Sequence, residues 1–244
     1  MDFHPSITLY ERTEDLNLQI GRGLIEGHSL VNVQGFNIDQ PAGFRAVWER
    51  SATLAYVYPS ISVPMSFSSS LSETLTLFVA GLDDTYSIKN AIVQFNGSTT
   101  GTVISGTSTF FRINSMRIIK GVALDTIVAT NNGNYYAQIN PGAGNSQASI
   151  YTVPLGYTFY LTRAQAFTTN NGTQYCTYRV YSQNFVDGVL TNSTVLSAPF
   201  NSAYSSTRVI PRGYEEKTDI QWQLSQSNAA PGSIQVEGIL IKNT

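Results

Sequence analysis

Alternation of apolar and polar residues is the feature that most constrains how this chain can fold. Residues 220–224 read IQWQL and residues 234–237 read IQVE, so apolar and polar side chains follow each other with a period of two. Successive side chains of a β-strand point to opposite faces, which makes such segments typical of strands with one buried face. Similar short segments recur along most of the chain, and they predict a β protein.

The clearest pair of strands lies between residues 74 and 95. Leu75, Leu77 and Val79 share one face of the first strand, and residues 91, 93 and 95 (Ala, Val, Phe) share one face of the second. The residues between them, Gly-Leu-Asp-Asp at 81–84, are typical of a turn, so we expect an antiparallel hairpin. Asn96-Gly97 is expected to end the second strand. Between residues 110 and 119 the alternation changes phase near Asn114, which predicts a β-bulge.

Helix signals are nearly absent, and the one candidate, residues 10–20, is equally compatible with a turn at 13–16. Glycines at 21, 23, 27 and 35 favour an extended arm with bends. An Asn- and Gly-rich stretch at 130–146 suggests a domain boundary. Short strands with turn signals every 8–12 residues are typical of sandwiches. We therefore predict an all-β chain: an arm at 1–43, then two antiparallel β-sandwich domains of jelly-roll or Ig-like type at 44–140 and 141–244.

Composition excludes several classes of function. Charged residues make up 12% of the chain, against about 25% in typical globular proteins, and the formal net charge is −2. We therefore expect no attraction to nucleic acid or to an anionic membrane. The single cysteine, Cys176, rules out an internal disulfide and a four-cysteine zinc site. We find neither a signal peptide nor an apolar run long enough to cross a membrane, and we expect no cofactor and no bound metal.

The sequence offers no constellation that is typical of an enzyme. Its two histidines are His4 and His28, and His28 is expected to lie in a turn. Cys176 lies within a predicted strand, where a buried and inert thiol is expected. The carboxylate pairs at 83–84 and 215–216 fall in predicted loops, and neighbouring residues of a strand point to opposite faces, so neither pair forms a clamp. We therefore predict that the protein is not an enzyme.

The order of several motifs resembles a family of structural proteins from the virions of tailed phages, of the kind found in marine phages and cyanophages. The resemblance begins with residues 19–29 (QIGRGLIEGHS) and 31–37 (VNVQGFN) and continues through 79–86 (VAGLDDTY) and 111–113 (FRI). It extends through 149–161 (SIYTVPLGYTFYL), 217–220 (KTDI) and 240–243 (LIKN), and it is weakest over 44–65. The resemblance implies a place in a virion and implies no catalytic residue.

The leading hypothesis is a non-enzymatic component of a tailed-phage virion, made in the host cytoplasm and acting by protein–protein assembly. It would be a head decoration, a collar or neck protein, or a protein associated with the tail or fibre. Its partners would be other virion proteins and further copies of itself, with a trimer as the first expectation. The N-terminal arm is expected to make these contacts through its apolar residues and one histidine: Leu18, Ile20, Leu24, Ile25, His28, Leu30 and Phe36.

Two alternatives remain open. A carbohydrate-binding module for adhesion to a host-surface glycan would use aromatic residues in exposed loops, for which Tyr135, Tyr136 and Tyr204 are candidates. A glycan-degrading enzyme of the tailspike kind would need carboxylates that converge in a groove. The absence of a repeat period argues against that enzyme.

Overall fold

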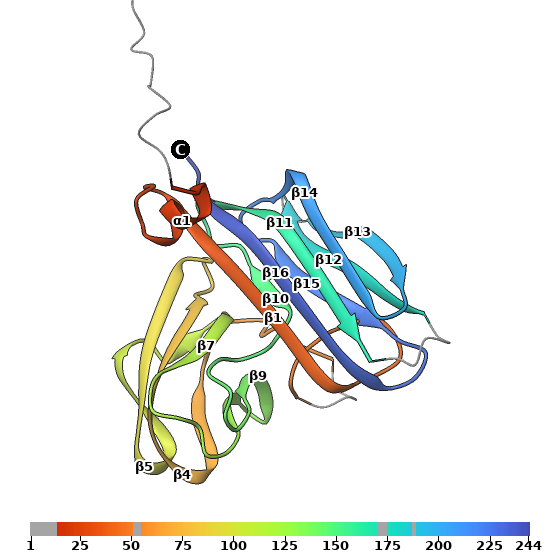
Figure 1. Ribbon diagram of the computed structural model, residues 1–244. Coiled ribbons are helices and arrows are strands. Elements are labelled where there is room, and N and C mark those ends of the chain that lie inside the picture. Colours follow the sequence, from red (N-terminus) through yellow and green to blue (C-terminus); the bar gives the residue numbers. More distant parts are fainter. Residues whose placement is uncertain (1–13, 51–54, 170–174, 187–188) are drawn as a thin grey trace, which may run out of the picture.

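The computed structural model describes residues 14–50, 55–169, 175–186 and 189–244 (Figure 1). Nearly all of the regular structure is β, in several antiparallel sheets, as the alternation predicts. Within the described ranges the α-helical structure consists of one short helix, α1 (Leu16–Gly21). This helix overlaps the C-terminal half of the segment that the sequence offered as its only helical candidate, residues 10–20, and extends one residue beyond it. Residues 1–13, including His4, lie outside the described residues.

Two sheets pack face to face around one core. The front sheet, nearest the viewer in Figure 1, has the order β1-β16-β11-β14, and the back sheet has the order β10-β15-β12-β13, with β2 pairing with β15. Both sheets contribute to the core, for example Phe159 and Val236 from the front and Tyr178 and Trp222 from the back. The front strands are β1 (His28–Gln40), β16 (Ala230–Lys242), β11 (Tyr157–Thr168) and β14 (Ala203–Tyr214). The back strands are β2 (Arg45–Ala46), β10 (Ile150–Thr152), β12 (Cys176–Val186), β13 (Val189–Phe200) and β15 (Asp219–Ser225).

The middle of the chain forms a second lobe with a core of its own, which we call the middle lobe. Its main sheet has the order β5-β4-β8-β9. β8 pairs with residues 66–69 of β4 and β7 pairs with residues 76–82, while β3 and β6 form a separate two-stranded sheet. Leu77, Val93, Phe110 and Ile127 are fully buried there. The strands are β3 (Val63–Pro64), β4 (Ser66–Leu82), β5 (Ile88–Gly106), β6 (Thr109–Phe110), β7 (Arg112–Lys120), β8 (Ile127–Asn131) and β9 (Asn134–Ile139).

The register of the middle lobe confirms two of the sequence predictions and corrects one. Leu75 pairs with Phe95, Leu77 with Val93 and Val79 with Ala91, so the expected hairpin forms with its apolar faces together. The pairing of β4 with β7 skips Asn114, which is the predicted bulge. Asn96-Gly97, however, does not end β5. The pairing shifts there and Gly97 has a φ of 65°, so the strand passes through an irregularity and continues to residue 106.

The prediction of an arm that extends over residues 1–43 is wrong for β1. Residues 28–37 pair continuously with β16, and Val33 lies in the shared core. Val47 belongs to that same core, so the segment just after residue 44 joins the two-sheet module and not the middle lobe. Gly35 explains part of the error, because a Cβ there would collide with the Val47 carbonyl oxygen and lie 2.7 Å from the Cβ of Ser149. That glycine permits a close crossing of chain segments and does not mark a bend.

Candidate assembly surface

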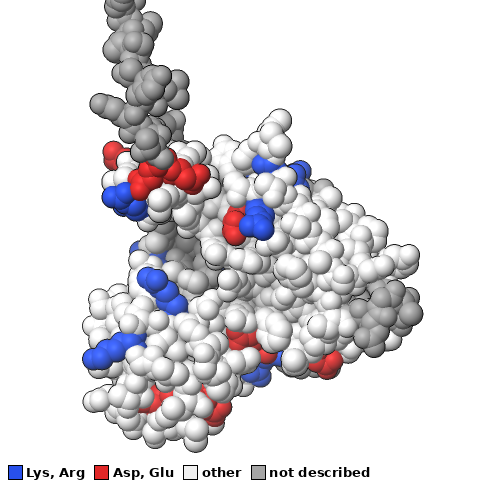
Figure 2. Space-filling model, viewed as in Figure 1, with Lys and Arg blue, Asp and Glu red and all other residues white. Residues whose placement is uncertain are grey.

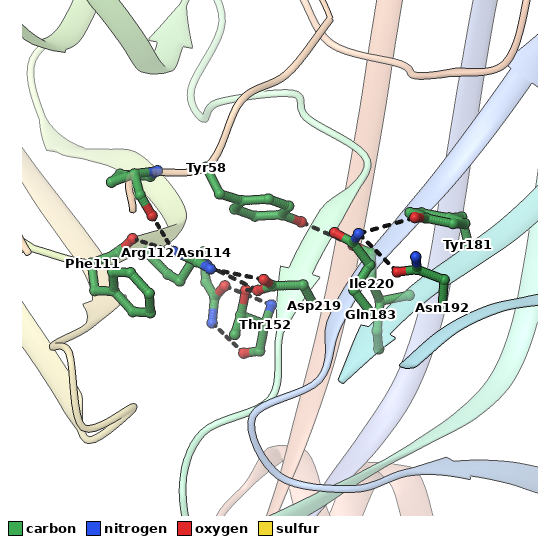
Figure 3. Close-up of polar contacts among 11 residues, drawn as sticks. Tyr58, Phe111, Arg112, Asn114, Thr152, Tyr181, Gln183, Asn192, Asp219 and Ile220 are labelled. Carbon is green, nitrogen blue, oxygen red and sulfur yellow. Dashed lines mark hydrogen bonds and ion pairs between the residues drawn. The ribbon is translucent and has the colours of Figure 1, made fainter. Parts of the chain in front are cut away.

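A buried ion pair joins the middle lobe to the two-sheet module (Figure 3). Arg112 of β7 donates from Nε to Oδ1 of Asp219 at 2.9 Å and from Nη2 to Oδ2 at 2.8 Å, and both side chains are nearly inaccessible to solvent. Its Nη1 donates to the carbonyl oxygens of Pro59 and Phe111, each at 2.9 Å. The Thr152 hydroxyl donates to Oδ1 of Asp219 at 2.5 Å. We call this arrangement the interlobe anchor.

Polar contacts around the pair complete the anchor. The Asn114 side chain donates to the Thr152 carbonyl oxygen and accepts from the Thr152 amide, both at 2.9 Å, so the bulge in β7 has a structural use. The ring of Tyr58 lies 4.5 Å from the Arg112 guanidinium carbon. Burial alone would lower the pKa of Arg112, but the hydrogen bonds and charge of Asp219 outweigh it and raise that pKa. The buried ion pair between Arg112 and Asp219 therefore connects the middle lobe to the two-sheet module.

The side chains that were considered for catalysis either make hydrogen bonds that hold turns and loops or are buried. Oδ1 of Asp83 accepts hydrogen bonds from the amides of Thr85 and Ser87, each at 3.0 Å, which closes the turn after β4. Oε2 of Glu216 accepts from the Gly156 amide at 2.6 Å. Cys176 is buried, as predicted, and desolvation raises the pKa of its thiol to about 11. Among the described residues, no three His, Cys, Asp or Glu side chains lie together in a way that could hold a metal ion.

The residues that the sequence proposed for assembly divide into three groups. Leu18, Leu24 and Leu30 are about half exposed, at 53%, 59% and 47%. Ile20 is buried, because α1 packs this side chain inward, so it is not available to a partner; Ile25 and His28 are partly buried. Phe36 is exposed but lies six residues beyond Leu30 on β1, roughly 20 Å along an extended strand. The set therefore does not form one surface.

Local hydrogen bonds fix the position of α1, and the leucines of this helix remain exposed. Asp15 caps the helix by accepting from the amides of Asn17 and Leu18, and Gln19 donates to the Glu14 carbonyl oxygen at 2.6 Å. Ile20 is then buried, whereas Leu16 and Leu18 are each 53% exposed. The contacts within the described part of the subunit show no role for these two exposed leucines.

A second apolar feature lies nearby on β14, and the sequence reasoning missed it. The pairing of β11 with β14 jumps from Arg163–Thr207 to Leu161–Arg212, so residues 208–211 bulge out opposite Thr162. Val209 and Ile210 in this bulge are 99% and 84% exposed. Figure 2 shows a projection at the end of β14, with basic side chains beside it. The sequence signal was an apolar pair between two arginines, followed by a proline.

A hollow of about 200 Å³ lies beside this bulge. It is lined by Asn17 of α1, by Leu30 of β1, by Ile239 of β16 and by Thr162, the residue opposite the bulge. We call the exposed leucines of the N-terminal segment, the hollow and the β14 bulge together the candidate assembly surface. Their shared position near one end of the front sheet follows from the pairing of β1, β16, β11 and β14.

The tyrosines that were expected in exposed loops are not there. Tyr135 and Tyr136 belong to β9, where Tyr136 is 6% exposed. Tyr204 lies on β14, and its ring stacks on that of Tyr178 with 4.9 Å between centroids. These residues pack within the protein, so they do not provide the loop-based sugar site of the second hypothesis.

Comparisons with known proteins found no matching family model, no similar curated protein and no similar solved structure. None of the helical structure in the described ranges is long and apolar enough to span a membrane.

Proposed function

We propose that this protein is a non-enzymatic structural component of a tailed-phage virion that acts by protein–protein assembly. The observation that carries the proposal is the β14 bulge, which holds two branched apolar side chains almost wholly in solvent. Exposing Val209 and Ile210 in this way has no benefit for an isolated subunit, and clustered exposed apolar groups are typical of interaction sites. The order of sequence motifs that resembles virion proteins supports the location.

The geometry favours contacts between different surfaces of neighbouring copies. The bulge is a projection, and the hollow beside α1 is a depression with Leu30 and Ile239 in its lining. A projection of one subunit that enters the hollow of the next makes a head-to-tail contact, which closes into a ring when the rotation permits. We propose a cyclic homo-oligomer, with a trimer as the first candidate, attached to other virion proteins at the head, the collar or the tail.

The same proposal includes the finer fold. The shared core of the front and back sheets supports a β-sandwich for the two-sheet module, and the separate core of the middle lobe supports a second domain. Such modules would present strand ends and loops toward neighbours, while the interlobe anchor would keep the two domains at a fixed angle within a symmetric assembly.

Light scattering coupled to size-exclusion chromatography tests this assembly. We expect the native chain to elute as an oligomer, and we expect Val209→Ser with Ile210→Ser to dissociate it. The matched control is Ile119→Ser with Val122→Ser, a pair of the same types that is 49% and 63% exposed in the middle lobe. A native protein that is monomeric at high concentration, or an oligomer that the bulge variant leaves intact, contradicts the proposed contact.

A further inference from the structure

The outer face of the front sheet carries its side chains in rows that cross all four strands. Antiparallel pairing aligns β1, β16, β11 and β14, and the residues between the buried ones point outward. Three successive rows, read from β1 to β14, are Phe36-Ser233-Phe167-Ala203, Gln34-Gln235-Gln165-Ser205 and Asn32-Glu237-Arg163-Thr207. The first row is aromatic and small, the second is an amide row, and the third has one charge pair.

The amide row has unused hydrogen-bonding capacity. Within the described part of the chain, the side chains of Gln34, Gln235 and Gln165 make no hydrogen bond to another protein group. Neighbouring strands lie about 4.8 Å apart, so the three amides form a line with that spacing. Each amide offers two N–H donors and one carbonyl acceptor. A ligand with closely spaced hydroxyl groups can both donate to and accept from such a line.

The aromatic row borders a hollow of about 290 Å³. Phe36 and Phe167 stand two strands apart, about 10 Å, with Ser233 between them and Gly232 and Ala203 nearby. The side chains of Phe36 and Phe167 are 36% and 42% exposed, and the pairing of the strands does not require aromatic residues at these outward-facing positions. Small residues between two exposed rings leave room for a flat, ring-shaped group against each aromatic face.

Charge on this face is balanced. Arg163 and Glu237 oppose each other at 3.8 Å and are the only charged residues in the three rows. Figure 2 looks onto this face and shows a broad uncharged area with one acidic and one basic group side by side. Such a face neither attracts a polyanion, such as a nucleic acid or a sulfated polymer, nor selects a cationic peptide.

We propose that this face binds a neutral glycan, with sugar rings packed on Phe36 and Phe167 and hydroxyl groups bonded to the row of glutamines. Sugar rings combine an apolar face with a rim of hydroxyl groups, which matches one aromatic row beside one amide row. The site differs from the exposed-loop tyrosines of the sequence hypothesis, because a strand face holds it. It goes beyond the proposed structural role and does not depend on it, since each subunit contains the whole face.

The test uses the full chain on a printed array of neutral, acidic and sulfated glycans. We expect binding to neutral glycans, and the neutral glycan with the strongest array signal is then titrated against each variant by calorimetry. Phe36→Ala with Phe167→Ala should weaken binding by roughly tenfold or more for each ring lost. Gln165→Ala with Gln235→Ala should also weaken it, and this second variant leaves every apolar contact of the sheet in place.

The control is Ile104→Ala, which removes an exposed apolar side chain (57% exposed) from β5 in the middle lobe. It should bind like the native chain, as should Val209→Ser with Ile210→Ser when affinity is expressed per subunit. Binding of no neutral glycan overturns the proposal, and so does binding confined to acidic or sulfated glycans. Equal affinity of both face variants and the native chain also overturns it, because the ligand would then sit elsewhere.

Discussion

Removing one partner of the interlobe anchor should destabilise the whole chain strongly. In Asp219→Asn, one carboxylate oxygen becomes an amide N–H₂ that faces the Arg112 guanidinium or the Thr152 hydroxyl, both of which donate to it in the native protein. Because Arg112 is only 6% exposed, its charge cannot recover hydration. Breaking a buried pair in this way costs about 3–5 kcal/mol of unfolding free energy. Arg112→Met should cost a similar amount, since Asp219 then stays buried without its cation.

A double-mutant cycle separates this pair from general damage. The variant with both Arg112→Met and Asp219→Asn should lose less than the sum of the single variants, by roughly 1–3 kcal/mol, because no unpaired charge remains. Urea unfolding at pH 7 measures the three variants, with fluorescence from Trp222 in the two-sheet core and Trp48 between the lobes. Additive losses, or a cost below about 1 kcal/mol for Asp219→Asn, would refute the reasoning, because a desolvated pair cannot give either result.

Three further predictions concern other buried groups. Glu73→Ala should cost about 2–4 kcal/mol in urea unfolding, because the buried carboxylate accepts from the Leu124 and Asp125 amides, which would lose their partner; Glu73→Gln should cost less. Desolvation raises the pKa of Glu49 to about 7, so the folded state holds this proton more tightly than the unfolded state. As the pH rises from 4.5 to 7, the unfolding free energy of the native chain should therefore fall relative to that of Glu49→Gln. Parallel plots of unfolding free energy against pH for the two proteins would contradict this. Cys176 should react with a thiol reagent only after unfolding, and fast labelling of the native chain would show that it is accessible.

Local patterns predicted the local structure well. The faces assigned to residues 75–79 and 91–95 meet as expected, and the phase change at Asn114 is a bulge. Ile220, Trp222 and Leu224 are fully buried, as their alternation indicates. These features depend on side-chain periodicity and turn residues, which a single strand or hairpin already contains.

Such local patterns could not predict contacts between segments that are distant in the sequence. β1 pairs with a strand about two hundred residues later, and Arg112 bonds to Asp219 across 107 residues. The glycines in and before β1 suggested an extended arm with bends, because close crossing of chains and bending both favour glycine. Residues 44–48 were assigned to the middle domain for a similar reason, since nothing local shows that β2 pairs with β15.

The two candidate surfaces depend on register in the same way. Phe36 was expected in an assembly interface with Leu18 and Leu30, but pairing places it in a row with Phe167. The row of glutamines comes from three strands, so no single segment reveals it. Val209 and Ile210 would be ordinary strand residues in a regular β14, and only the jump in pairing exposes them.

A search for the protein in purified phage particles is the most direct test of its proposed structural role. Under this proposal a tailed phage encodes the chain, and particles of that phage can be purified on a density gradient, digested for mass spectrometry and reconstructed by electron microscopy. The account predicts peptides of this protein in intact particles, at a copy number that follows the symmetry of the head, collar or tail. It also predicts density in which the β14 bulge of one subunit meets a neighbouring chain. Purified, infectious particles that lack the protein would contradict the account.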